Sequence, residues 1–377
     1  MSLKLSHNRN DERHKIPNPQ CHGGAISLRA LKKRVRFALA LPRFLYGLIT
    51  GYFYDVRRYY RAASKGNEAV CAGRPSYTEL KSWIAADTHK IEKALSLREP
   101  RPGFGAAVVR RLVEYLQVFH SSFGIEQTTQ IAVNTLLAYC HFNKEHNVDD
   151  ELLYEQVITL ANQAGLTNSA VGEGGVLKIT RDAILAQALI PNIEKFFTSR
   201  YSIRDFSSAP VQLESIEKAV RMAQKTPSVC NRQSWKTYAY LDEKEMKRIF
   251  DFQQGNRGFG ELAGGALVVT SDLATFFSYF ERNQAWIDGG MFAMSLVYAL
   301  HAVGLGSCCL NWSAEPSSDR ALHKQLGIPE NEVVIMIIAI GCLPDELNVA
   351  QSLRKPIEEV LVLGRLDGEN SGEDGVR

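Results

Sequence analysis

The chain has 377 residues, of which 45% are apolar and 23% charged, and its net charge is +3. These proportions exclude a largely disordered chain, and the length is sufficient for two domains. The near-neutral charge argues against a nucleic-acid binder. The seven cysteines show no CxxC pair and no zinc-ligand spacing, so reduced thiols and a cytoplasmic protein are expected rather than a disulfide framework.

The N-terminal part changes in character along the chain. Residues 1–27 are polar, which favours a flexible N-terminus, and no apolar run follows the first charges, so we expect no secretory signal. In residues 28–62, nine Lys and Arg face a single acid, Asp55, and flank the apolar run 37–54. That run contains Arg43 and is too short for a transmembrane helix, which needs about 20 apolar residues. Two alternatives remain: a helix packed on the core or on a dimer partner, and a peripheral contact with the inner face of the membrane.

Residues 76 to 197 have a helical pattern. Ser76 and Glu79 have the spacing of a capping box, and apolar residues then recur at i, i+3 and i+4. A further helix is expected to bend at Pro191. The predicted helices cover 76–97, 105–123, 127–146, 149–165 and 180–200. The region 28–190 is therefore predicted to be all-helical.

After residue 200 the pattern alternates between strands and helices. Strands are predicted at 236–242, 265–272 and 332–341, and helices at 211–225, 243–254, 283–304 and 317–326. The last strand is a nearly continuous apolar run, which is typical of a central strand covered on both faces. The tail 366–377 is Gly-rich and acidic, which favours flexibility.

Four polar segments in this second half could carry chemistry, although each alone also fits an ordinary surface loop. Arg200, Ser202 and Arg204 offer two guanidiniums and a hydroxyl within five residues, a good set of phosphate donors. Asn231 and Gln233 can donate and accept, which suits the polar edge of a pyrimidine ring. The third segment, 304–312, has glycines that let backbone approach a ligand closely. The fourth, 351–361, offers further cations before a proline.

In this order and spacing the four segments resemble the nitroreductase family of flavoproteins, over roughly residues 195–365. The resemblance implies an α+β fold with a central mixed sheet flanked by helices at 191–365, after the helical region. It also implies a homodimer with FMN at the subunit interface, and NAD(P)H as co-substrate. More loosely, the segment 89–105 resembles long nitroreductase-like proteins linked to surface-polysaccharide genes.

The resemblance carries specific residues over to the FMN site. The implied set is Arg200, Tyr201, Ser202, Arg204, Pro227, Ser228, Asn231, Gln233, Leu310, Asn311 and Arg354. Within it, Arg200 and Arg354 would hold the phosphate and Arg204 would lie near the pyrimidine, with backbone at Leu310 near flavin N5. The chain departs from the family pattern at Ser234, where proline is usual before Trp235, and in "CCLNW", which replaces Pro-x-Gly.

The resulting prediction is an FMN-dependent oxidoreductase that passes hydride from NAD(P)H through FMN to a small organic acceptor, with no side-chain nucleophile. The alternative is a flavin-binding accessory protein at the membrane surface with little turnover. His89 and Glu92 share a helical face, but two ligands do not make a metal site, so a solvated helix face is favoured. A bolder hypothesis has His89, Glu92 and Arg101 contact the substrate. Trp235 is expected to be a core anchor.

Overall fold

The computed structural model describes residues 45–47, 49–63, 75–148, 150–166, 174–188, 190–350, 352 and 354–364. The chain divides into two compact units, residues 1–54 and 55–377. The expected flexible ends, 1–27 and 366–377, lie outside the described residues. Residues 49–62 are helical. Within the described part of the chain, no helix is long and apolar enough to cross a membrane.

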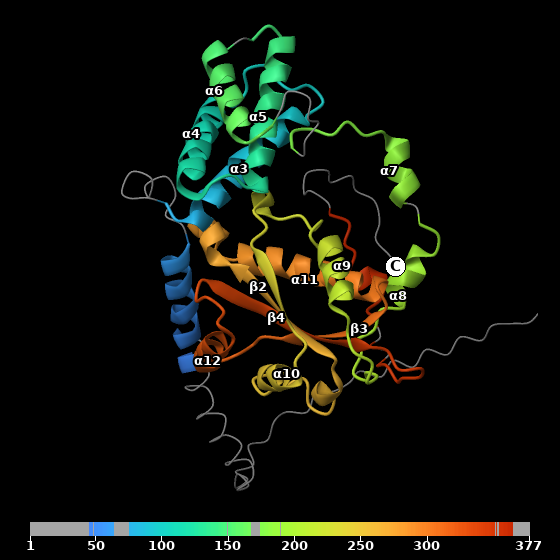
Figure 1. Ribbon diagram of the computed structural model, residues 1–377. Helices are drawn as coiled ribbons and strands as arrows, with labels where there is room; N and C mark the ends of the chain where they lie inside the picture. The colour runs from blue at the N-terminus through green and yellow to red at the C-terminus, as the bar shows by residue number, and fades with distance from the viewer. Residues whose placement is uncertain are drawn as a thin grey trace, which may run out of the picture. The chain divides into compact units, whose positions relative to one another are not determined.

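Within the predicted helical region, four of the described helices lie together and share one core (Figure 1). They are α3 (Tyr77–Leu95), α4 (Ala106–Phe123), α5 (Gln127–Glu145) and α6 (Glu151–Gln163). Ile84, Leu112 and Leu136 are fully buried between them. The predicted capping box is confirmed, because Ser76 Oγ accepts from Glu79 N at 3.3 Å while the Glu79 carboxylate accepts from Ser76 N at 2.9 Å.

The helix expected over 180–200 is two helices, α7 (Arg181–Ala188) and α8 (Ile193–Thr198). Pro191 and Asn192 separate them, and Asn192 has a left-handed φ of 64°. Proline lacks the backbone N–H that a helix interior needs, and a residue in the left-handed conformation cannot continue a right-handed helix. The expected bend is therefore a full break.

The second half of the chain contains a four-stranded sheet in the order β1-β2-β4-β3. Its strands are β1 (Trp235–Tyr240), β2 (Gly265–Asp272), β3 (Leu305–Asn311) and β4 (Glu332–Cys342). The α+β class is confirmed, but the expected mixed sheet is wrong in detail, since every pairing between these strands is antiparallel. The mixed sheet was implied by the family resemblance, and the spacing of polar segments along a chain does not fix the direction in which its strands pair.

Helices cover both faces of this sheet, as Figure 1 shows. On one face, Leu267 and Ile338 pack against α9 (Leu213–Ala223) and α11 (Gln284–Ala302). On the other, Val268 and Ile337 pack with α10 (Glu243–Phe250) and α12 (Pro316–Leu326). Strand β4 lies between β2 and β3 and is covered on both faces, which confirms it as the predicted central strand. Its neighbour β3 was not predicted.

Candidate functional site

The arginine-rich segment 200–206 runs beside edge strand β3. Ile203 N donates to Ser307 O at 2.9 Å and Ser207 N donates to Cys342 O at 2.9 Å. Ile203 and Phe206 are buried in the core, whereas Arg204 is exposed and Arg200 is half-buried. The segment therefore points its apolar residues inward and its cations outward.

Glycines in the two neighbouring strands make this close approach possible. A Cβ on Gly306 would lie 3.1 Å from Ile203 Cγ2, and one on Gly341 would lie 2.5 Å from Phe206 Cδ1. Any side chain at Gly341 would displace the phenylalanine ring. The glycine at 306, which the sequence suggested for ligand approach, thus makes room for the chain's own segment 200–206.

The two cations of this segment are available to an anion. Among the described residues, neither Arg200 nor Arg204 forms an ion pair with a carboxylate, and Arg204 Nη1 only approaches Ser202 O at 3.5 Å. Arg200 lies near the end of α11, where burial and the Arg200 cation lower the pKa of His301. Ser202 is half-buried and Tyr201 is exposed beside them.

The polar loop 227–233 has an unusual backbone. Cys230, Asn231 and Gln233 have left-handed φ values of 50°, 51° and 49°. Such values are uncommon for residues other than glycine and cost about 1–2 kcal/mol each. Gln233 N donates to Ser228 Oγ at 3.0 Å. Asn231 and Gln233 are exposed, so the strained backbone presents two amide side chains outward; Pro227, at the start of the loop, is exposed and Ser228 is half-buried.

Strand β1 and helix α11 hold this loop in place. Val229 N donates to Asp288 Oδ2 at 3.1 Å, and burial raises the pKa of that carboxyl. Ser234 is buried, and its Oγ lies 2.7 Å from Ser271 Oγ of β2. The hydroxyl that replaces the family's proline therefore joins the end of the loop, just before β1, to β2. Trp235 stacks on Phe292 at 4.9 Å, which confirms it as a core anchor.

The end of β3 lies at the same end of the sheet as this loop. Asn311, at the end of β3, pairs with Met336 of β4. Met336 pairs with Val269 of β2, and Val269 pairs with Thr237 near the start of β1. Leu310 is buried in the core, so only its backbone is available to a ligand. Asn311 is exposed, and its carbonyl accepts from Gln253 Nε2.

Among the described residues, no hydrogen bond or ion pair joins the remaining sequence candidates to these three segments. Arg354 is in the exposed stretch 354–364 and donates to Ser352 O. Glu92 is half-buried, and its carboxylate accepts from Thr135 Oγ1 of α5 at 3.4 Å. Burial raises the pKa of Glu92. His89 is half-buried and Arg101 exposed.

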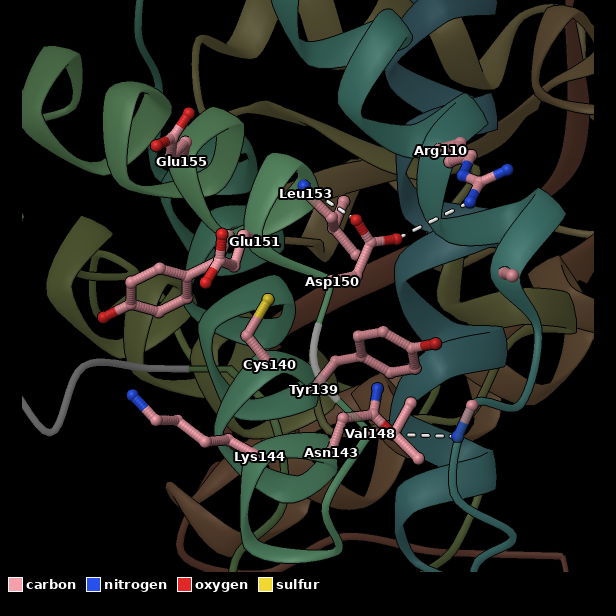
Figure 2. A pocket seen from close by; sticks show the side chains of 13 residues that line it. Arg110, Tyr139, Cys140, Asn143, Lys144, Val148, Asp150, Glu151, Leu153 and Glu155 are labelled. Carbon is pink, nitrogen blue, oxygen red and sulfur yellow. Dashed lines mark hydrogen bonds and ion pairs between the residues drawn. The ribbon is translucent and has the colours of Figure 1, made fainter.

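A separate pocket of about 600 Å³ lies among α4, α5 and α6 (Figure 2). Its charges are mixed: Arg110 pairs with Asp150 at 3.5 Å, and Lys144 Nζ lies 5.7 Å from the centre of the Tyr154 ring. Burial raises the pKa of Cys140 in its wall to about 11, so this thiol stays protonated at neutral pH. Sequence patterns did not indicate this pocket. Over the described residues, no group of potential ligands could hold a metal ion.

Comparison with known proteins gives a family for the second half of the chain. Residues 197–256 and 255–342 match the model of the nitroreductase family. An Archaeoglobus fulgidus protein named, provisionally, as an NADH dehydrogenase/NAD(P)H nitroreductase is 29% identical over 155 residues, which is 40% of this chain and 86% of that protein. Iodotyrosine deiodinase of Nematostella vectensis is 26% identical over 202 residues, covering 45% and 74%. Among solved structures, an FMN-dependent nitroreductase of Clostridium difficile has 24% identity and a TM-score of 0.37, covering 42% of this chain and 91% of that one.

The second half of the chain is thus an α+β domain of the oxidoreductase class. More specifically, the chain carries a nitroreductase-family domain, within which the segments 200–206, 227–235 and 305–311 lie. The match begins after α7, and the four-helix region lies outside it.

Proposed function

We propose that the chain binds FMN and transfers hydride from NAD(P)H to a small organic acceptor. The observation that carries this proposal is the pair of cations, Arg200 and Arg204, placed along β3 without carboxylate partners among the described residues. The exposed amides of Asn231 and Gln233 supply a second, complementary donor set. The two guanidiniums fit a phosphate, and the two amides fit the polar edge of a ring.

Each group has a role that follows from its chemistry. Arg200, with Arg354 brought in from the exposed stretch 354–364, would form charge-assisted hydrogen bonds to the FMN phosphate. Asn231 and Gln233 would donate to and accept from the ring edge. Arg204 would stabilise negative charge on the reduced ring. Bound FMN would supply hydride acceptance at its N5 atom, while the chain supplies orientation and electrostatics.

The test of this proposal is flavin binding by the purified protein. The wild type should be yellow, and the double variant Arg200→Gln/Arg354→Gln should bind FMN at least about tenfold more weakly, because two charge-assisted hydrogen bonds are lost. The variant Arg248→Gln, which changes an exposed arginine on α10, is the matched control. A folded wild type that takes up no FMN would refute the proposal.

We also propose that the domain forms a homodimer through α11. Along this helix, Trp286, Ile287, Met291 and Met294 form an exposed apolar stripe at helical spacing, from 38% to 51% exposed. A large exposed apolar patch typically marks an interaction site. Met291→Asp/Met294→Asp should shift the protein toward monomer in analytical ultracentrifugation. Met222→Asp, at an exposed methionine of α9, should not.

A second candidate function places the chain at a membrane surface as a flavin-binding accessory protein. The observation in its favour is the outer side of the helix 49–62, where Val56 and Tyr60 are exposed beside Arg57 and Arg61. Two measurements separate the candidates. An accessory protein, once photoreduced, would reoxidise no faster with organic acceptors than with oxygen alone. Binding to anionic vesicles, lost in Arg57→Glu/Arg61→Glu, would support membrane contact.

A further inference from the structure

Arg232 is a buried cation in the middle of the polar loop. Its side chain is 0% exposed, although Asn231 and Gln233 on either side are exposed. Arg232 Nη2 donates to Glu281 Oε1 at 2.5 Å, Nη1 to Thr275 O at 2.9 Å, and Nε to Val229 O at 3.2 Å. A buried guanidinium is stable only when its charge is paired and its N–H groups are bonded, so this side chain has one fixed position.

Aromatic rings complete the surroundings of Arg232. Its guanidinium carbon lies 4.4 Å from the centre of the Phe277 ring and 5.3 Å from that of Phe276. Both distances fall within the range of cation–π contacts. Glu281 also accepts from Phe277 N at 3.0 Å. The arginine thus ties the polar loop to the segment 275–281, which lies about 45 residues further along the chain.

The loop requires such a restraint because of its left-handed backbone. The peptide groups around Val229 are held from two sides, since its N–H donates to Asp288 of α11 and its carbonyl accepts from Arg232. Immediately after it, Cys230, Asn231 and Gln233 have positive φ. Without the two anchors, an extended or right-handed backbone would be favoured, and the amides of Asn231 and Gln233 would point elsewhere.

The N-terminal helices lie against the same loop. Tyr59 and Val229 both pack against the cluster that contains the buried ring of Phe276, and the Tyr59 hydroxyl donates to Ser278 O at 2.7 Å. Helix α3 contacts both η1 (Val229–Asn231) and η3 (Leu273–Thr275). The two segments joined by Arg232 are therefore also the segments that the helical region touches.

We propose that Arg232 is a positioning residue for FMN, which acts through the polar loop 227–233. Tyr59, on the helix 49–62, adds a contact from the N-terminal helical region to the same restraint. The inference rests on the proposed flavin site and explains what the helical region does for it. Arg232 itself does not contact the ligand. It fixes the backbone from which Asn231 and Gln233 reach the ring edge.

The experiment is an FMN titration of the folded apoprotein, followed by fluorescence. Arg232→Met keeps the length of the side chain and removes its charge and donors; it should weaken FMN binding at least about tenfold. Arg232→Lys retains one charge opposite Glu281 and should recover part of the affinity. Tyr59→Phe removes one hydrogen bond and should weaken binding by about threefold. Arg248→Met and Tyr52→Phe, the second at an exposed tyrosine of the same helix as Tyr59, are the matched controls and should bind as the wild type does.

A second readout separates positioning from simple destabilisation. At saturating FMN, Arg232→Lys should show a lower kcat for acceptor reduction with little change in the KM for NAD(P)H, since the ring is held less firmly. Should Arg232→Met fail to fold, Arg232→Lys and Glu281→Gln carry the test. Wild-type affinity in the folded Arg232 variants would overturn the inference while leaving the proposed function intact. Absence of FMN binding by the wild type would overturn both.

Discussion

At the scale of single residues, Arg200 of the proposed phosphate site affects the protonation of a neighbouring histidine, His301. Burial, and to a lesser extent the Arg200 cation, lowers the pKa of His301, whose Nε2 lies 2.9 Å from Ser199 Oγ. Because the folded-state pKa of His301 lies below its usual 6.5, the folded protein binds this proton only at a lower pH than the unfolded chain does. The contribution of His301 to stability is therefore present above pH 6.5 and is lost as the pH falls through the folded-state value.

The variant Arg200→Gln should raise the pKa of His301, because it removes a like charge. The measurement is a histidine NMR titration, with Arg248→Gln on α10 as the control that leaves this pKa unchanged. The same variant should lose less of its free energy of unfolding than the wild type between about pH 7 and about pH 5. An unchanged His301 pKa would show that Arg200 does not lie beside the end of α11.

At the scale of elements, the packing of α11 on β4 depends on a glycine that the sequence does not distinguish from its neighbour. A Cβ on Gly289 would lie 2.5 Å from Ile335 Cγ1, whereas one on Gly290 meets nothing within 4 Å. Gly289→Ala should therefore destabilise the fold by about 1–3 kcal/mol through overpacking. Gly290→Ala should be neutral or stabilising by up to about 1 kcal/mol, because alanine favours a helix interior. Urea unfolding measures both, and equal losses would contradict the close α11–β4 contact.

The elements also show how far sequence patterns reach. Strands β1, β2 and β4 were predicted within a few residues. Apolar runs with β-branched residues mark β2 and β4, and alternating tyrosines mark β1. Strand β3, with Gly306, Ser307 and two cysteines, has no such pattern; only its pairing with β4 makes it a strand. The same is true of the antiparallel direction of the sheet, which depends on contacts between distant residues.

The candidate site was predicted in part for a similar reason. Its outward-facing residues, Arg200, Asn231 and Gln233, belong to a spaced motif and could be found in the sequence. Arg232 and Asp288, which hold the loop from behind, could not. The sequence does not distinguish a buried arginine from an exposed one, and only the fold shows that Glu281 and two phenylalanines surround Arg232.

At the scale of the whole molecule, Arg58 of the helix 49–62 joins residues 55–62 to the nitroreductase-family domain, in addition to the Tyr59 contact with Ser278. Arg58 Nη1 donates to Asp319 Oδ2 at 2.7 Å, and Nη2 lies 2.8 Å from His323 Nε2 of the same helix, α12. Its Nε donates to Glu330 O at 2.6 Å. These contacts favour the packed alternative over a purely lipid-facing one for the inner side of this helix.

Arg58→Ala should lower the free energy of unfolding by about 3 kcal/mol, because it removes the guanidinium that pairs with the buried Asp319 carboxylate. It should also make the helix accessible to proteases. Arg61→Ala, at an exposed position on the same helix, is the control and should change stability by less than about 0.5 kcal/mol. The comparison fails to support the account if both variants unfold at the same urea concentration.

The central claim is that this nitroreductase-family domain uses FMN to accept hydride from NAD(P)H. The most direct measurement is anaerobic rapid mixing of the FMN-loaded protein with NADH and with NADPH, followed by the flavin absorbance. At least one nucleotide should bleach the flavin, and an organic acceptor should then restore its colour. A folded, FMN-loaded protein whose flavin stays oxidised with both nucleotides would contradict it.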